Sequence, residues 1–203
     1  MSPFLNSDNI LRSTSSIEYH PLLPFLPEST KILFLGSFPP QRKRWCMDFF
    51  YPNFTNDHWR IMGLIFFNDK NNFVDSVEKN FKLDSIVDFL KEKCIGYYDT
   101  AEAVKRLKDN ASDKFLEVVE YTDINALLEK IPDCRVVVTT GEKATENIVK
   151  QMSLSELPTV GNYVQLKENI LLYRLPSSSR AYPLSLEKKA EAYRKMFEIA
   201  GII

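Results

Sequence analysis

The chain is poor in the residues that build metal sites. Only three of its 203 residues are cysteines, and Cys46, Cys94 and Cys134 are odd in number and far apart. No two have the CxxC spacing typical of zinc sites and iron–sulfur clusters, so the sequence holds no ligand set for either. We therefore expect three reduced, mostly buried thiols and no bound metal, as in a cytoplasmic protein.

Long apolar runs and an excess of positive charge are also missing. No segment has the roughly 20 consecutive apolar residues of a membrane helix. Residues 1–9 lack the basic start and apolar stretch of a signal peptide. The formal net charge is −1, so no global basic field points to a nucleic acid, although a local patch can still contact phosphates. We expect a soluble, cytoplasmic protein.

What the chain does have is enough apolar sequence for one folded domain. Hydrophobic residues make up 44% and aromatic residues 12% of the 203 positions, which favours a single domain with a substantial core. In residues 1–30, Pro21, Pro24 and Pro27 are closely spaced, which predicts an N-terminal arm or cap rather than a helix. We expect one domain over residues 1–203.

Apolar runs of strand length alternate with helical patterns along the chain. Strands are expected at 31–35, 135–139 and 170–175, and a short strand or turn at 95–98, with a pairing of 163–166 to the last strand left open. Helices are expected at 56–67, 73–93, 99–107, 123–131, 142–152 and 185–200, and a polar loop at 108–115. This alternation predicts the α/β class: a three-layer α/β/α sandwich around a central, mainly parallel four-stranded sheet.

The segment that follows the first strand carries groups suited to holding a nucleotide. Gly36 ends the strand and lets the backbone approach a ligand closely. Aromatic rings for stacking, amides for reading a base edge and cations for phosphates follow: Phe38, Phe50, Tyr51, Asn53, Asn56, Arg42, Lys43 and Arg44. Aromatic, amide and cation together are what nucleotide recognition needs. Plainer interpretations stay open, namely core aromatics, a helix cap at Asn56 and a solvated basic loop.

A second loop follows the last strand. Pro176 stops the strand, and Ser177, Ser178 and Ser179 offer hydroxyls and backbone amides to a phosphodiester. Arg180, Ala181 and Tyr182 follow and project something larger beyond them, the order that a wedge into duplex DNA requires. A serine-rich turn before a helix is the alternative. Because the carboxyl ends of parallel strands meet at one edge of a sheet, we expect the two loops to form one crevice.

These loops resemble motifs of the uracil-DNA glycosylase superfamily, especially its mismatch-specific uracil/thymine branch and the related hypoxanthine-DNA glycosylases. The similar segments are Leu35–Pro39, Asn53–Arg60, Gly96–Asp99, Thr140–Ala144 and Leu175–Arg180. They occur in the family's order and extend over most of the chain. The chain departs from the pattern in three places, one of which is His58 where a Phe precedes the Trp in the family's motif. Ser37-Phe38 stand where many members have Asp or Asn, and Ser177 stands where the fastest members have His.

The resemblance implies a monofunctional DNA glycosylase of base excision repair that flips a deaminated base, uracil or hypoxanthine, and hydrolyses its N-glycosidic bond. It implies a base pocket of Gly36, Ser37, Phe38, Phe50, Tyr51 and Asn53. Asn56 would position the attacking water, and His58 is either an acid or a packed side chain. It implies that Ser177, Ser178 and Ser179 hold the DNA backbone, with Arg180 or Ala181 at the wedge. The basic run Arg42, Lys43 and Arg44 is expected to add DNA contacts. The expected partner is DNA, without metal, organic cofactor or membrane, and the expected protein is monomeric.

Two other classes remain open. The first is a catalytically weak or inactive nucleic-acid-binding module on the same fold, favoured by the missing first-motif Asp or Asn and by the near-neutral charge. The second is a small-molecule α/β enzyme such as a nucleoside hydrolase-like protein, which would need acidic or histidine side chains clustered at the strand ends. A salt-sensitive affinity for DNA would separate the glycosylase and the binding module from this enzyme.

Overall fold

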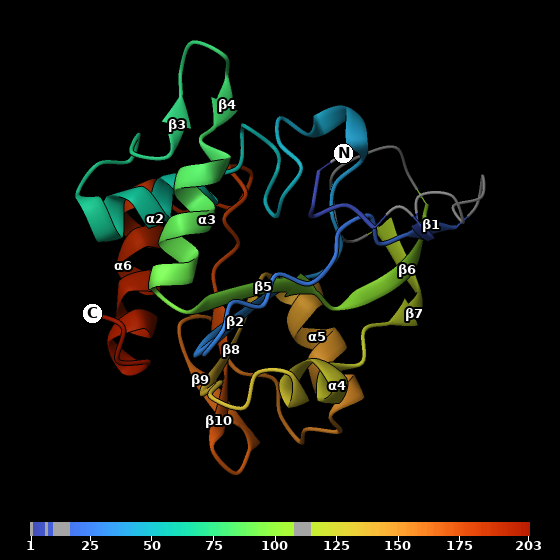
Figure 1. The fold of residues 1–203 in the computed structure, drawn as a ribbon. Helices are drawn as coiled ribbons and strands as arrows, with labels where there is room; N and C mark the ends of the chain where they lie inside the picture. Colours follow the sequence, from blue (N-terminus) through green and yellow to red (C-terminus); the bar gives the residue numbers. More distant parts are fainter. Residues whose placement is uncertain (1, 7, 10–16, 108–114) are drawn as a thin grey trace.

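A computed structural model describes residues 2–6, 8–9, 17–107 and 115–203. At its centre is a five-stranded sheet in the order β5-β2-β8-β10-β9 (Figure 1). Four strands are parallel: β2 (Ile32–Gly36), β5 (Ile95–Asp99), β8 (Val136–Thr140) and β10 (Ile170–Leu175). The fifth, β9 (Tyr163–Lys167), pairs antiparallel with β10 at the edge. The α/β class is confirmed, and the pairing left open at 163–166 makes the sheet five-stranded.

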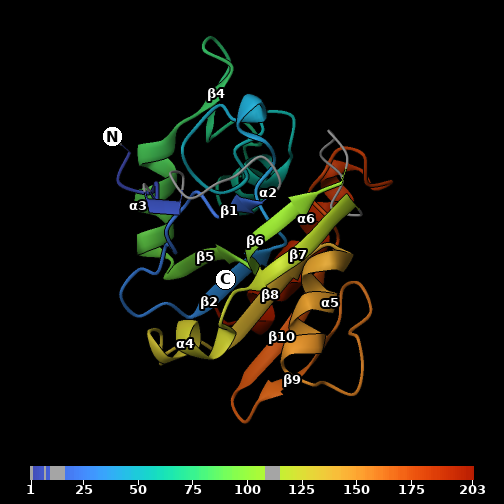
Figure 2. The same cartoon turned by 90° about the vertical axis from the view of Figure 1, so that its right-hand side faces the viewer.

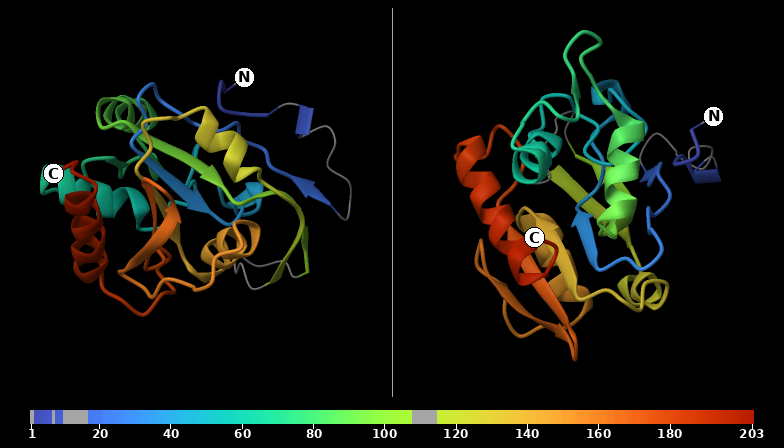
Figure 3. Two further views of the ribbon diagram at one scale, coloured as in Figure 1. Left: turned by 90° about the horizontal axis from the view of Figure 1, so that it is seen from below. Right: turned by 60° about the vertical axis from the view of Figure 1, so that its left-hand side comes forward.

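Helices cover both faces of this sheet. On one face lie α2 (His58–Phe67), α3 (Leu83–Glu92) and α6 (Leu186–Ile199), and on the other α4 (Ile124–Glu129) and α5 (Glu142–Gln151) (Figures 1 and 3). Coverage on both sides explains why Ile32–Leu35 and Val136–Thr140 are buried at every position. Side chains of Asp123 and Ser185 accept hydrogen bonds from Ala126 N and Lys188 N and so start α4 and α6. The sandwich expected from the sequence is therefore present.

One predicted helix, 73–93, is half wrong. Its first part is a hairpin of β3 (Val74–Asp75) and β4 (Asn80–Phe81), and only α3 follows as a helix. The Asp75 carboxylate accepts hydrogen bonds from Val77 N and Glu78 N, and Lys79 has a φ of 50°. This side-chain-capped turn with a left-handed residue reverses the chain where the pattern of apolar residues alone suggested a continuous helix.

The predicted helix 99–107 is wrong. The segment is the strand β6 (Ala101–Arg106), which pairs antiparallel with β1 (Glu18–Tyr19) and β7 (Leu116–Tyr121) in a second sheet (Figure 2). Its Ala, Glu, Lys and Arg residues favour helix locally, but strand partners on both edges outweigh that propensity. Of the predicted loop 108–115, all but residue 115 lies outside the described residues.

The N-terminal segment 17–30 lies against the domain over its length. Besides the β1–β6 pairing, His20 N donates to Glu102 O, and Phe25 pairs with Tyr97 of β5. Within the part of the chain that the structure describes, no helix combines the length and apolarity that crossing a bilayer requires. The three cysteines carry free thiols, and burial raises the pKa of Cys134 to about 11.

Candidate functional site

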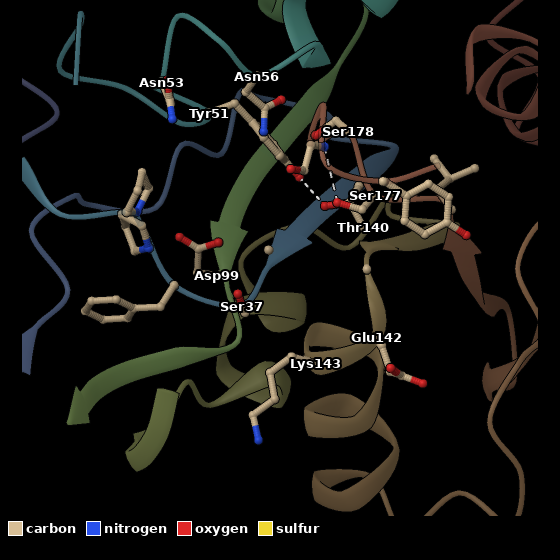
Figure 4. A pocket seen from close by; sticks show the side chains of 18 of the residues that line it. Ser37, Tyr51, Asn53, Asn56, Asp99, Thr140, Glu142, Lys143, Ser177 and Ser178 are labelled. Atoms are coloured by element: carbon tan, nitrogen blue, oxygen red, sulfur yellow. Dashed lines mark hydrogen bonds between the residues drawn. The ribbon is translucent and has the colours of Figure 1, made fainter. Parts of the chain in front are cut away.

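The carboxyl ends of the four parallel strands surround one cavity of about 1100 Å³ (Figure 4). Each strand contributes its last residue to the lining: Gly36, Asp99, Thr140 and Leu175. The loop after β2 and the loop after β10 both line the cavity, although more than a hundred residues separate them. The single crevice expected from the sequence is present.

Most of the predicted site residues line this cavity. They are Gly36, Ser37, Phe38, Phe50, Tyr51, Asn53, Asn56, Ser177, Ser178, Ser179 and Ala181. The basic run does not line it, because Arg42, Lys43 and Arg44 form the short 3-10 helix η1 (Arg42–Arg44) and are exposed. Arg42 pairs with Asp48 and lies over the Trp45 ring at 4.4 Å. The basic run is thus a surface feature outside the cavity.

Tyr51 is held rigidly at the cavity wall. Its backbone has a φ of 50°, its hydroxyl lies 2.6 Å from Thr140 Oγ1 at the end of β8, and its ring stacks on His58 with centroids 3.7 Å apart. A left-handed φ at a tyrosine costs free energy, so these contacts are needed to maintain it. Tyr51 therefore joins the first loop to the third strand of the sheet.

His58 is a packed side chain and not an active-site acid. It is fully buried, does not line the cavity, and its Nε2 lies 2.8 Å from Tyr97 Oη. Within the described residues its Nδ1 has no hydrogen-bond partner. Desolvation by burial lowers the pKa of His58 to about 3, so the imidazole is neutral near pH 7. Of the two roles open from the sequence, packing is the one that the structure shows.

This neutral, buried His58 predicts a specific loss of stability in acid. In the unfolded chain the imidazole has an ordinary pKa near ~6.5, whereas in the folded protein the pKa is about 3. Between these values the unfolded state binds one more proton, so the stability present above pH ~6.5 is lost as the pH falls, at up to roughly 1.4 kcal/mol per pH unit. Urea unfolding at pH 7.5 to 4.5 should show a pH slope steeper for the wild type than for His58→Gln. Equal slopes would contradict this account of His58.

The two asparagines present hydrogen-bond donors to the cavity. The Oδ1 of Asn56 accepts from His58 N at 2.9 Å, and the Oδ1 of Asn53 accepts from Thr55 N at 3.0 Å and Thr55 Oγ1 at 2.9 Å. With the oxygens engaged in the local turn, both amide nitrogens point into the cavity (Figure 4). An N–H donor can hold a water oxygen or a carbonyl oxygen of a base. The N-cap of α2 is Asp57 and not Asn56, so the cap expected at Asn56 lies one residue further along. Asn56 supports the chain just before the helix through its bond to His58 N, and its amide nitrogen faces the site.

The sequence interpretation gave no role to two residues of the site: Asp99, which ends one of the similar segments, and His20. The Asp99 carboxylate lines the cavity, and its Oδ2 lies 2.8 Å from Nε2 of the buried His20. A Cβ at Gly36 would overlap the Asp99 Oδ1. Gly36 thus makes room for a neighbouring carboxylate, whereas the sequence suggested room for a ligand. Asp99 had a detectable signal, since it ends an apolar strand as Gly36 does, but His20 lies 79 residues away in the chain.

The serine loop is fastened to the helical face by buried charges. Ser178 O accepts from Asp57 N at 3.0 Å, and Ser179 O accepts from Lys189 Nζ at 2.7 Å. The Asp57 carboxylate accepts in turn from Lys189 at 3.3 Å and from Arg180 Nε at 3.0 Å. Of the two residues predicted at the wedge, Arg180 is therefore bound to Asp57, while Ala181 is exposed at the cavity.

Comparison with known proteins bears on the fold. No protein-family model matches the chain, and no curated protein sequence matches it. Among solved structures it is similar to the solution NMR structure of a Methanosarcina acetivorans protein that is provisionally assigned as a uracil DNA glycosylase. The two are 24% identical, the match covers 90% of this chain and 99% of that one, and the TM-score is 0.59. At this identity the likeness shows a shared fold.

Proposed function

We propose that this protein is a monofunctional DNA glycosylase that hydrolyses the N-glycosidic bond of a flipped-out deaminated base, uracil or hypoxanthine, in base excision repair. One observation carries the proposal. Aromatic rings, two amide donors, a buried carboxylate and a serine loop line a single cavity at the carboxyl ends of four parallel strands. The cavity, about 1100 Å³ in volume, has room for a base together with its sugar and phosphate.

The base pocket is assigned to the aromatic side of the cavity. Phe38 and Phe50 are 7% and 3% exposed and both line the cavity, so their rings are fixed surfaces beside which a flat base can stack. Tyr51 is anchored at hydroxyl and ring, which keeps the pocket shaped before a base enters. The amide of Asn53 is available to a carbonyl oxygen on the base edge.

Asn56 is the candidate for holding the attacking water. Its amide nitrogen faces the cavity while its oxygen is bound to the first turn of α2, so the donor group is fixed in direction. A water oxygen held by this donor keeps a lone pair free for attack at the sugar carbon. The neutral His58, buried behind Tyr51, takes no part in the proton transfer.

The DNA backbone is assigned to the serine loop and to the exposed basic run Arg42–Arg44. Small hydroxyl side chains at Ser177 and Ser179 allow close approach of a phosphodiester, and the loop is held in place through Ser178 O and Ser179 O. Arg42, Lys43 and Arg44 supply exposed cations on the loop that leads away from the cavity. With a net charge of −1, we expect DNA binding through these local contacts, with an affinity that falls as salt rises.

The test is an excision assay on labelled duplexes. The duplexes carry uracil opposite guanine, uracil opposite adenine, hypoxanthine opposite thymine or thymine opposite guanine, and alkali then cleaves the abasic sites. We expect cleavage at uracil or at hypoxanthine and none in the undamaged duplex. Salt-dependent binding without cleavage of any duplex would instead support a nucleic-acid-binding module, and neither binding nor cleavage would reject both functions.

A further inference from the structure

The proposed function assigns no role to the most buried carboxylate of the cavity. Three carboxylates line it: Asp99, Glu142 and Glu146. Glu142 and Glu146 are exposed on α5, and Glu142 faces Arg174 at 3.6 Å. Asp99 is only 7% exposed and stands at the end of β5, next to the end of β2. Burying a carboxylate costs free energy unless hydrogen bonds or ion pairs offset the lost hydration, so the groups that bind each oxygen of Asp99 indicate its role.

His20 fixes one oxygen of this carboxylate. The His20 Nε2 lies 2.8 Å from Asp99 Oδ2, and the imidazole is fully buried. On the far side of the ring, Nδ1 lies 2.9 Å from Leu22 O and 3.2 Å from Leu22 N. The backbone of Leu22 therefore provides both an acceptor and a donor for Nδ1, so that Nε2 can donate to Asp99 in either protonation state of the ring.

The other oxygen of Asp99, Oδ1, lies beside the first motif, in which Ser37-Phe38 stand in place of an Asp or Asn. Asp99 Oδ1 lies over Gly36, where no larger residue would fit beside it. The next residues, Ser37-Phe38, supply neither a carboxylate nor an amide side chain. The asparagine amides direct N–H groups into the cavity, so they can hold a water but do not present a strong acceptor for its proton. Asp99 Oδ1 is a carboxylate acceptor at the strand end itself.

We propose that Asp99 is the catalytic carboxylate that accepts the proton of the attacking water, and that His20 is a residue of the N-terminal arm that positions it. The proposal rests on the glycosylase function above. The water oxygen forms the bond to C1′, the N-glycosidic bond breaks with its electron pair remaining on the base nitrogen, and the water proton moves to Asp99 Oδ1. That proton then leaves with the base or to solvent, which restores the carboxylate.

One consequence concerns the arm. Segment 17–30 supplies His20 behind the carboxylate and Leu22 to the cavity lining. It is bound to the domain through β1 and β6 and through the bridge between Phe25 and Tyr97. The arm is thus part of the catalytic unit, because the orientation of Asp99 depends on it.

The test compares single-turnover excision by the full chain and its variants, using whichever damaged base the wild type removes best. Asp99→Asn should lower the excision rate by about 10²–10⁴-fold, with affinity for a duplex carrying an abasic-site analogue changed less than ~3-fold. Formate should partly restore Asp99→Ala by returning a carboxylate. Glu129→Gln, an exposed change on α4, is the charge-matched control and should act as wild type. Thermal unfolding confirms that each variant is folded.

The positioning role of His20 is tested by two variants of that residue. His20→Leu should slow excision while leaving DNA affinity unchanged, and His20→Gln should recover part of the rate, because its amide can donate to Asp99 where leucine cannot. A folded Asp99→Asn protein with near wild-type rates would overturn the proposal while leaving the glycosylase function intact. The proposal would also be overturned if Asp99→Asn lost excision of only one base and bound DNA containing that base more weakly, since Asp99 would then recognise the base. No excision by the wild type would overturn both.

Discussion

Replacing Asn56 with alanine is expected to reduce base excision by at least about 100-fold, the usual contribution of a positioned polar group to a proton-transfer step. DNA affinity should remain near the wild-type value, because the serine loop and the exposed basic run are untouched. The expected loss follows from the orientation of the Asn56 amide. The Asn56 oxygen is bound to His58 N, so its amide nitrogen is the group left to hold water in the cavity. Single-turnover excision and duplex binding, measured on the same preparation, check both parts.

A matched variant separates this role from a structural one. Asn56→Asp keeps the oxygen that accepts from His58 N but replaces the N–H donor with a second acceptor. Asn56→Ala should lose about 1 kcal/mol of stability with the hydrogen bond from His58 N, whereas Asn56→Asp should keep that bond and still excise poorly. Wild-type excision by Asn56→Asp would show that the donor facing the cavity has no catalytic role.

Replacing Lys189 with methionine is expected to destabilise the fold by about 3 kcal/mol, the low end of the cost of leaving one partner of a buried ion pair alone. Lys189 is 1% exposed and binds both the Asp57 carboxylate and Ser179 O. Methionine fills the space but leaves a mostly buried carboxylate with Arg180 as its remaining cation, and Arg180 is half-exposed. Urea unfolding measures the change, and the same variant should bind DNA more weakly because the serine loop is released.

The same helix provides the control. Lys195 pairs with Glu191 one turn away, and both side chains are about two-thirds exposed, so Lys195→Met should change stability by less than about 0.5 kcal/mol. Adding Asp57→Asn to Lys189→Met should restore part of the lost stability, since the mostly buried carboxylate that lost its buried cation is then replaced by a neutral amide. If Lys189→Met and Lys195→Met unfold at the same urea concentration, the buried network does not hold the loop.

The sheet and its crevice could be predicted because each depends on short, strongly apolar runs. β2, β8 and β10 are buried strands bounded by Gly36, Gly141 and Pro176, and such boundaries are visible in a sequence. The segment that became β6 could not be predicted in this way. Its residues favour a helix, and its strand partners β1 and β7 lie elsewhere in the chain. Local propensity gave the wrong answer where long-range pairing decides.

The site residues likewise differ in whether local sequence could predict them. The aromatic, amide and serine positions were predicted because they lie in the two segments that follow β2 and β10. The His20–Asp99 and Asp57–Lys189 pairs join residues 79 and 132 positions apart, and no pattern within a short window relates them. Gly36 shows the intermediate case. The need for a glycine was predicted, whereas the reason for it, the Asp99 carboxylate, required the register of β2 with β5.

The central claim is that this cavity releases an intact base from DNA by hydrolysis. The most direct measurement is a time course that quantifies, by mass spectrometry, the free base and the abasic strand formed from duplexes containing uracil or hypoxanthine. The account predicts equal amounts of base and abasic strand, with no strand break before alkali is added. Intact duplexes after long incubation with excess protein would contradict it, and so would cleaved strands without free base.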